Sequence, residues 1–166
     1  MLEAGTVDEG HCVGPITHQG HGAVLEDIQR LSDAIAGRAH EDVFVCAVAP
    51  SYIAATVPNE YYRTEEEYEQ ALADALREEY RAIIDSGAVV QLDDPRLITQ
   101  YTFNPHLSIE EYRRWAERHV ETINYSIRGL PAEMIRFHTC YSIDVGPRVH
   151  ELELKHAVDL LLRIEA

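Results

Sequence analysis

Two residue types that bind transition metals lie two positions apart in the segment RFHTCYS, at His138 and Cys140. The segment 134–140 predicts a β-strand, and side chains two apart on a strand point to the same face. Both side chains would therefore face the same way at the C-terminal end of that strand. An imidazole and a thiolate are ligands that suit zinc. The pair alone also fits a buried thiol beside a hydrogen-bonded histidine, so its meaning depends on its surroundings.

A second polar group ends the preceding predicted strand, in the segment VVQLDDP. Gln91 and Asp93 alternate onto one face, and Pro95 ends the strand pairing. Asp93 and Asp94 would then lie at the same rim of a sheet as His138, where parallel barrels carry their site residues. A carboxylate before proline also often caps the following turn, and Asp94 can do this while Asp93 serves a site.

Two further segments, HCVGPITHQGHG and APSYIAATVPNEYY, each predict a strand followed by a loop that could line a pocket. A solvated loop explains both compositions nearly as well. Asn59, in the second loop, is a candidate substrate contact. The first segment contains four metal-binding residue types whose spacing matches no common zinc module: His11, Cys12, His18 and His21. Cys46 is expected to be a core thiol.

The composition of the chain excludes several classes of function. The 166 residues include 29 acidic and 14 basic ones, a formal net charge of -15, so nucleic acid and anionic membranes are not expected partners. No apolar run has membrane-spanning length and the first ten residues do not resemble a signal peptide, which predicts a cytoplasmic location. Three cysteines, an odd count, argue against a disulfide framework. The sequence has no G-x-x-x-x-G-K phosphate-binding loop, no G-x-G-x-x-G dinucleotide-binding motif and no G-x-S-x-G nucleophile motif, which disfavours kinases, dinucleotide-dependent dehydrogenases and serine hydrolases.

The elements that would position these residues alternate between strands and helices. Strands are predicted at 11–16, 43–49, 88–92 and 134–140, and helices at about 23–36, 64–87, 108–129 and 153–163. Capping boxes, Thr64 with Glu67 and Ser108 with Glu111, mark the starts of the two long helices. The order βαβαβαβα, with long loops after the first three strands, predicts one α/β domain over residues 1–166. A complete barrel needs about 250 residues, so we expect a partial TIM (β/α)8 barrel of about four βα units.

The packing of this partial barrel follows from the same patterns. Leu76, Trp115 and Ile123 lie on the apolar stripes of the two long helices and are expected to be buried against the sheet. The strand ends meet at one rim of a barrel, so His138 and Cys140 are expected to share a cavity with Asp93.

The segments VPNEYYRTEEEYEQALADALREEYRAIIDSGAVVQLDDP and HVETINYSIRGLPAEMIRFHTCYS resemble the C-terminal barrel of the cobalamin-independent methionine synthase family and its shorter bacterial relatives. Nearly the whole chain takes part in the resemblance. The family pattern has a strand that ends in I/L-Q-x-D-D/E-P, here residues 91–95, and a later H-x-C. The resemblance implies that His138 and Cys140 are zinc ligands. It also implies that Asp93 is the catalytic carboxylate that holds the substrate amino group, and that Gln91 and Asn59 bind substrate.

The resemblance further implies a zinc-dependent methyltransferase of methionine biosynthesis. In that family zinc binds the thiol of a homocysteine-like acceptor and lowers its pKa, and the methyl donor is usually a methylated tetrahydrofolate. The remaining family ligands, a glutamate and a second cysteine, would lie beyond Ala166, and Glu151, Glu153 and Glu165 do not replace them. The first strands of the family barrel likewise have no counterpart here.

Two alternatives stay open. A partial barrel has open sheet edges, so it could be a non-catalytic chain that self-associates or combines with a complementing barrel fragment. A related thiol-dependent, epoxide-opening lyase would be similar in fold. A metal-free uroporphyrinogen decarboxylase would also be similar in fold, but the H-x-C pair disfavours it.

Overall fold

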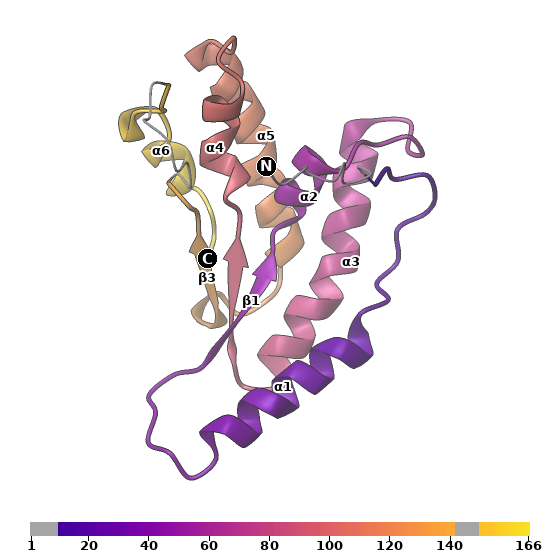
Figure 1. The fold of residues 1–166 in the computed structure, drawn as a ribbon, viewed down its shortest axis with the longest axis vertical. Coiled ribbons are helices and arrows are strands. Elements are labelled where there is room, and N and C mark those ends of the chain that lie inside the picture. Colours follow the sequence, from indigo (N-terminus) through magenta and orange to yellow (C-terminus); the bar gives the residue numbers. More distant parts are fainter. Residues whose placement is uncertain (1–9, 142–149) are drawn as a thin grey trace, which may run out of the picture.

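Three parallel strands form the sheet of the computed structural model, which describes residues 10–141 and 150–166. In sequence and in space they are β1 (Phe44–Val48), β2 (Val89–Asp93) and β3 (Ile135–His138). All three run in the same direction (Figure 1). Val48, Asp93 and His138 stand side by side in the register, so the strands end level. The α/β class and three of the four predicted strands are confirmed.

The sheet has one apolar face and one polar face, because side chains alternate along a strand. The apolar face consists of buried side chains, among them Ala47, Val90, Leu92 and Ile135. The polar face carries Cys46, Arg136 and His138, which are all exposed. The two faces therefore have different roles, one in folding and one available for chemistry.

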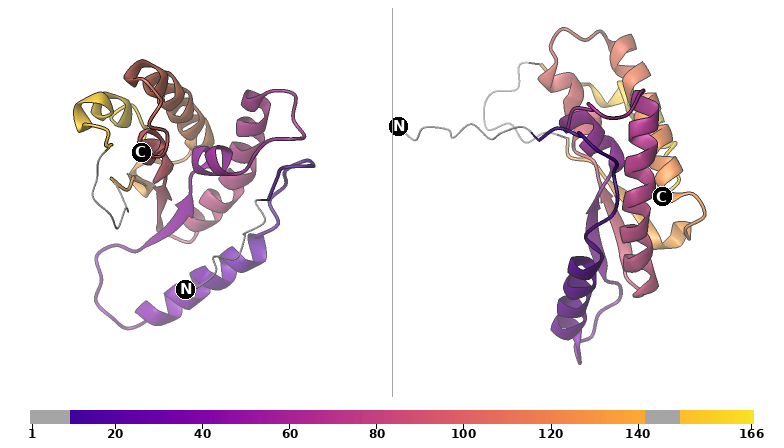
Figure 2. Two further views of the ribbon diagram at one scale, coloured as in Figure 1. Left: turned by 45° about the horizontal axis from the view of Figure 1, so that its top comes forward. Right: turned by 90° about the vertical axis from the view of Figure 1, so that its right-hand side faces the viewer.

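The two long helices, α3 (Glu65–Asp85) and α5 (Ile109–Ile127), pack against each other. The side view shows both lying on one side of the sheet (Figure 2). Their predicted capping residues are confirmed: the Thr64 hydroxyl accepts from the Glu67 amide at 3.1 Å, and Ser108 forms a complete capping box with Glu111. The chain leaves both helices through glycines with positive φ, which a residue with a side chain adopts only with strain.

These helices share one hydrophobic core with the sheet. Leu76 and Ile123 are buried, as predicted, whereas Trp115 is only half-buried and stacks on the ring of His119 at 3.9 Å. Tyr80, fully buried on α3, donates a hydrogen bond to the carbonyl of Val48 at 2.6 Å. The core thus fixes the end of β1 as well as its apolar face.

Two short helices replace the long loops that were predicted after the first strands of the sheet, and that prediction was wrong. Helix α2 (Pro50–Thr56) follows β1 directly, and α4 (Arg96–Phe103) follows β2 directly. Pro50 suits the first helical turn because its missing N–H has no partner there in any case. Both helices rise from the ends of their strands in Figure 1.

The predicted strand at 11–16 is also wrong. This segment forms a single parallel bridge between Cys12 and Asn59 and no strand. Two backbone hydrogen bonds of 2.9 Å hold it, from the Cys12 amide to Pro58 and from the Glu60 amide to Cys12. Val13 is 72% exposed and Ile16 is half-buried, so this segment contributes no residue to the buried core.

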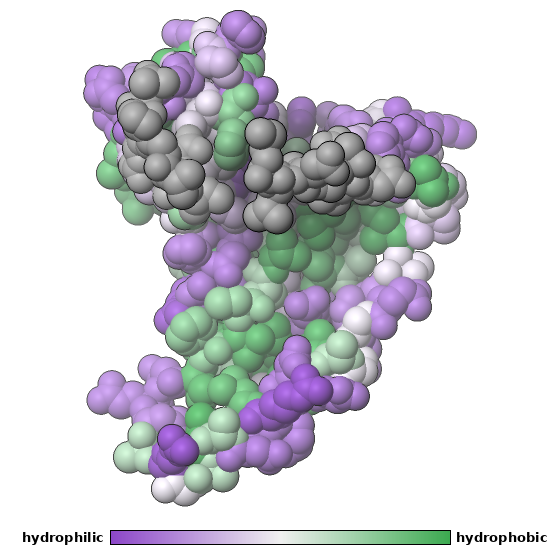
Figure 3. Space-filling view, in the orientation of Figure 1, coloured by the Kyte–Doolittle hydropathy of each residue, from purple (hydrophilic) through white to green (hydrophobic). Residues whose placement is uncertain are grey.

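The remaining elements lie at the edges of the sheet. Helix α1 (His21–Ile35) packs on α3, and the predicted helix at 153–163 consists of η2 (Leu154–His156) and α6 (Val158–Leu161). A short turn, η1 (Ala132–Met134), precedes β3. A groove of about 230 Å³ between α1 and the starts of β1 and β2 has mainly apolar walls, and Figure 3 shows hydrophobic surface in this part of the molecule. Within residues 10–141 and 150–166, no helix is long and apolar enough to cross a membrane.

Candidate functional site

The polar face of the sheet carries a carboxylate and an imidazole in direct contact. The Nδ1 atom of His138 lies 2.7 Å from Oδ1 of Asp93. The parallel register places the two residues directly opposite each other at the last position of β2 and β3. The expectation that Asp93 and His138 lie together at one rim is therefore confirmed.

This contact selects the form of the imidazole. An ionised carboxylate can only accept hydrogen bonds, so Nδ1 of His138 carries the shared proton. In the neutral ring Nε2 then keeps its lone pair free. The side chains of His138 and Asp93 are 54% and 31% exposed, so the pair is open to solvent. Metal-binding histidines commonly have this arrangement, in which a carboxylate holds the nitrogen that does not bind the metal.

Cys140 lies two residues beyond β3 and is a half-buried free thiol. The chain just before it is tied to β2: the Asp94 amide donates to the His138 carbonyl at 3.0 Å, and the Thr139 hydroxyl donates to the Asp94 carbonyl at 2.8 Å. In the part of the chain that the structure describes, no hydrogen bond joins Cys140 to His138 or Asp93. A shared cavity of Cys140 with these two residues stays a prediction.

A second polar row lies one step earlier along the strands. The Nε atom of Arg136 donates to Oε1 of Gln91 at 2.7 Å. The amide of Gln91 donates to Oδ1 of Asp93 at 2.9 Å and lies 3.4 Å from the sulfur of Cys46. The guanidinium of Arg136 also lies over the ring of Phe44, 3.5 Å from its centroid. Gln91 therefore links the two rows of the polar face.

Cys46 is exposed on this face, so the prediction of a core thiol was wrong. The apolar sequence of β1, FVCAV, does not reveal which alternate set faces the helices. Partial desolvation and the neighbouring Asp93 carboxylate raise the pKa of the Cys46 thiol. Cys46 is thus a neutral thiol at the edge of the candidate site.

Asp94 points the other way, into the interior, where it is fully buried. Its Oδ1 accepts from the Leu97 amide at 3.0 Å and its Oδ2 accepts from the Ser51 hydroxyl. Burial raises the pKa of this carboxyl despite these donors. The turn role predicted for Asp94 is confirmed, because the alternation of β2 sends Asp93 to one face and Asp94 to the other.

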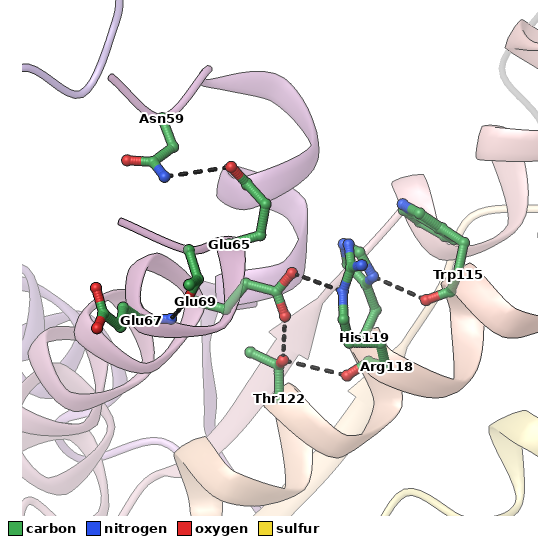
Figure 4. Close-up of polar contacts among 9 residues, drawn as sticks. Asn59, Glu65, Glu67, Glu69, Trp115, Arg118, His119 and Thr122 are labelled. Atoms are coloured by element: carbon green, nitrogen blue, oxygen red, sulfur yellow. Dashed lines mark hydrogen bonds and ion pairs between the residues drawn. The ribbon is translucent and has the colours of Figure 1, made fainter. Parts of the chain in front are cut away.

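The predicted substrate contact Asn59 lies in the loop between α2 and α3. Its Oδ1 accepts from the amides of Tyr61 and Tyr62 at 3.2 and 2.8 Å, and its Nδ2 donates to Glu65 at 3.2 Å. Figure 4 shows the contact with Glu65. Within the described residues no hydrogen bond joins Asn59 to Gln91 or to the other strand-end groups. The local role of Asn59 is to shape its own loop.

Residues 10–141 and 150–166 contain no group of three or more His, Cys, Asp or Glu side chains placed to hold one metal ion. His138 and Cys140 fit zinc in the chemistry of their donor atoms but supply two of the three or four protein ligands that zinc takes. Two of the histidines near the N-terminus lie beside carboxylates: His11 lies 2.7 Å from Glu60, and His18 lies 3.7 Å from Glu79.

A buried polar cluster between α3 and α5 was not predicted. Glu69 is 2% exposed, and its carboxylate accepts from Nε of Arg118 at 3.0 Å and from the Thr122 hydroxyl at 2.5 Å (Figure 4). Burial raises the pKa of Glu69. The cluster borders a pocket of about 190 Å³ on the helical side of the sheet. It ties the two helices together, and no motif in the sequence reveals it.

Comparison with known proteins finds relatives that are similar to part of this chain. No protein-family model matches it. The methionine synthase of Saccharolobus solfataricus is 28% identical to this chain over 117 residues, and that of Saccharolobus islandicus is 27% identical over the same length. Both matches cover 69% of this chain and 31% of the relative. The methionine synthase of Sulfurisphaera tokodaii is 26% identical over 102 residues, covering 61% of this chain and 26% of the relative. The chain spans about a third of the length of the curated relatives it matches, and within that span it is related to the methionine synthase family.

Proposed function

We propose that this chain provides part of the zinc site of a methyltransferase in methionine biosynthesis. The reaction would move a methyl group from a methylated tetrahydrofolate-type donor to the sulfur of a homocysteine-like thiol. The relatives named methionine synthase support the reaction class. The polar strand ends support the place in the fold where it occurs.

The contact between Asp93 and His138 is the observation that carries the proposal. It holds the imidazole through Nδ1, which leaves Nε2 for a metal ion, at the level end of two parallel strands. Cys140 follows two residues later and would supply the thiolate. These two residues would hold the zinc ion, with Asp93 as the carboxylate behind the imidazole.

The residues of this chain would bind and orient the acceptor. Zinc supplies a Lewis acid that lowers the pKa of the acceptor thiol, so that the thiolate forms at neutral pH. Asp93 has a second oxygen, Oδ2, that Gln91 and His138 do not use, and it can accept from the ammonium of an amino acid. One carboxylate could thus orient both the imidazole and the substrate.

The remaining ligands would come from a complementing part of a barrel. The sheet order β1-β2-β3 follows the sequence, and the long helices lie on one side, as in an arc of a (β/α)8 barrel. Both outer strands have an unpaired edge within the described residues. We propose that a further barrel segment or a second copy covers these edges and the polar face. A non-catalytic barrel fragment is the competing function, and the missing ligands favour it.

Cobalt substitution tests the zinc site directly, because a cobalt–thiolate bond gives a charge-transfer band that reports the sulfur ligand. We expect the full chain to bind Co²⁺ and Zn²⁺, and His138→Ala and Cys140→Ser each to remove most of the binding. Cys12→Ser is the matched control and should leave binding unchanged. Unchanged metal binding in both His138→Ala and Cys140→Ser would refute the proposal. A methyl-transfer assay with and without the barrel half of a relative then separates a catalytic chain from a silent fragment.

A further inference from the structure

Residues 11–20, here called the strap, run beside α3 from the loop between α2 and α3 to the start of α1 (Figure 1). Exposed and half-buried residues alternate along the strap, which is the pattern of an extended segment that lies on a surface. His18 is one of the residues on the inner side, and its side chain is only 8% exposed. The strap thus carries a histidine into its contact with α3.

His18 lies between two carboxylates of α3. Its Nδ1 is 3.8 Å from Oε2 of Glu78, and its Nε2 is 3.7 Å from Oε2 of Glu79. Both ring nitrogens are buried and have no hydrogen-bond partner within the described residues. The strap itself also encloses the ring, because a Cβ at Gly20 would lie only 3.3 Å from Nε2. The ring is therefore held away from water with a carboxylate near each nitrogen.

The protonation state of this ring decides whether the contact is favourable. A neutral imidazole has one N–H group and one lone pair, so it would turn its lone pair towards one of the two carboxylates. The imidazolium has two N–H groups and can donate to both Glu78 and Glu79. Burial raises the pKa of Glu79, and the charge of His18 opposes this change. The charged ring thus stabilises the docked strap, and the neutral ring does not.

The other charged groups around this contact add negative charge rather than a competing cation. Asp74 lines the same pocket as His18 and is a third carboxylate of α3. Arg30, on α1, pairs with two carboxylates of its own helix on the exposed side. Within residues 10–141 and 150–166, no lysine or arginine forms an ion pair with Glu78 or Glu79. His18 is therefore the group whose charge can balance these carboxylates.

We propose that the strap is a pH-sensitive device, which closes on α3 when His18 is protonated and loosens when the ring is neutral. Histidines change charge between about pH 5 and 8, so closure is favoured as the pH falls through this range and is lost as it rises. A pocket of about 400 Å³ lies between Ile16 and Thr17 of the strap and Ala71 and Ala75 of α3. Loosening the strap therefore opens this pocket. The device does not depend on the proposed zinc site.

The other end of the strap stays attached in either state. There the amides of Cys12 and Ile16 donate to the loop between α2 and α3, at 2.9 and 2.8 Å, and these bonds do not require a charged ring. His11 also lies 2.7 Å from Glu60, but these side chains are 42% and 55% exposed. Pairs as exposed as this one contribute little. The pH response is therefore expected at the His18 end.

Hydroxyl-radical labelling read by mass spectrometry measures side-chain exposure in the full chain, residue by residue. His18 is compared with His40, an exposed histidine that corrects for the effect of pH on the ring chemistry itself. From about pH 6 to about pH 8 we expect the labelling of His18 relative to His40 to rise about two- to fivefold. Tyr80, which is fully buried, should stay unlabelled at both pH values.

Variants then assign the response to His18. In His18→Gln the labelling of Ile16, the second reporter, should no longer depend on pH, whereas His11→Gln should keep the dependence. Glu78→Gln should raise the labelling of His18 at about pH 6, because one of its two carboxylates is lost. Glu60→Gln is the matched control and should leave it unchanged, since Glu60 is a similarly exposed partner of the other histidine.

Three results would overturn the proposal. The first is equal relative labelling of His18 at both pH values in wild type. The second is a response that disappears in His11→Gln and persists in His18→Gln. The third is labelling of Tyr80 in parallel with His18, because the pH would then unfold the whole core instead of loosening the strap.

Discussion

The substitution Asp93→Asn changes the contact on which the proposed zinc site depends, while keeping the shape of the side chain. The amide that results is a weaker acceptor than the carboxylate and cannot stabilise the imidazole electrostatically. A hydrogen bond with a charged group contributes about 1.5–3 kcal/mol. Both side chains are partly exposed, 54% for His138 and 31% for Asp93, so solvent screening places this contact near the low end. A loss of about 1.4 kcal/mol corresponds to zinc affinity about tenfold weaker.

Competition with a chromophoric chelator measures this change in zinc affinity. Glu60→Gln is a closely matched control, because Glu60 also lies 2.7 Å from a histidine Nδ1, that of His11, in a different part of the chain. We expect Asp93→Asn to weaken zinc binding and Glu60→Gln to leave it unchanged. Equal zinc affinity for wild type and Asp93→Asn would refute the reasoning that this carboxylate orients the metal-binding imidazole.

Three further predictions concern stability. Asp94→Ala should lower the free energy of unfolding by about 2–4 kcal/mol, because it removes the acceptor for the Leu97 amide and leaves the buried Ser51 hydroxyl unpaired. Urea denaturation measures this change, and a loss below about 0.5 kcal/mol would contradict the prediction. Ile123→Ala should lower the free energy of unfolding by about 2–5 kcal/mol in the same assay, because Ile123 is fully buried. A loss as small as that of a surface substitution would show that a different face of α5 packs against the core. Burial lowers the pKa of His119 to about 4, so the unfolded chain binds this proton more tightly than the folded one. Stability should therefore fall as the pH drops from 6.5 towards 4, and His119→Gln should flatten that slope; an NMR titration of the ring near 6.5 would contradict the buried state.

The sheet and the long helices could be predicted because local signals and tertiary packing agree there. The capping residues of α3 and α5 satisfy their own backbone amides, so these helix starts depend little on the rest of the fold. The contact of Asp93 with His138 follows from strand alternation and from the common direction of the strands. The site could thus be located without knowing the packing.

The rest depends on the tertiary structure. Helices α2 and α4 span seven and eight residues, too few for a hydrophobic period to stand out. The segment at 11–16 has the composition of a strand, but among the described residues no strand pairs with it beyond the single bridge at Asn59. Glu69 lies next to Tyr68 on the buried side of α3, and only the approach of Arg118 makes a carboxylate acceptable there. A short stretch of sequence therefore does not predict any of these three features.

Asp94 joins three separate segments of the chain at one point. Its side chain holds the starts of α2 and α4 through Ser51 and Leu97, and its backbone holds the end of β3 through His138 and Thr139. The backbone under the adjacent Asp93 therefore has little freedom, and the pair that Asp93 forms with the imidazole is arranged before any ligand arrives. A ligand that binds there does not have to order the loop ends, so less of its binding free energy is lost as conformational entropy. The polar face of this sheet is in this way preorganised by a carboxylate that lies buried on the opposite face.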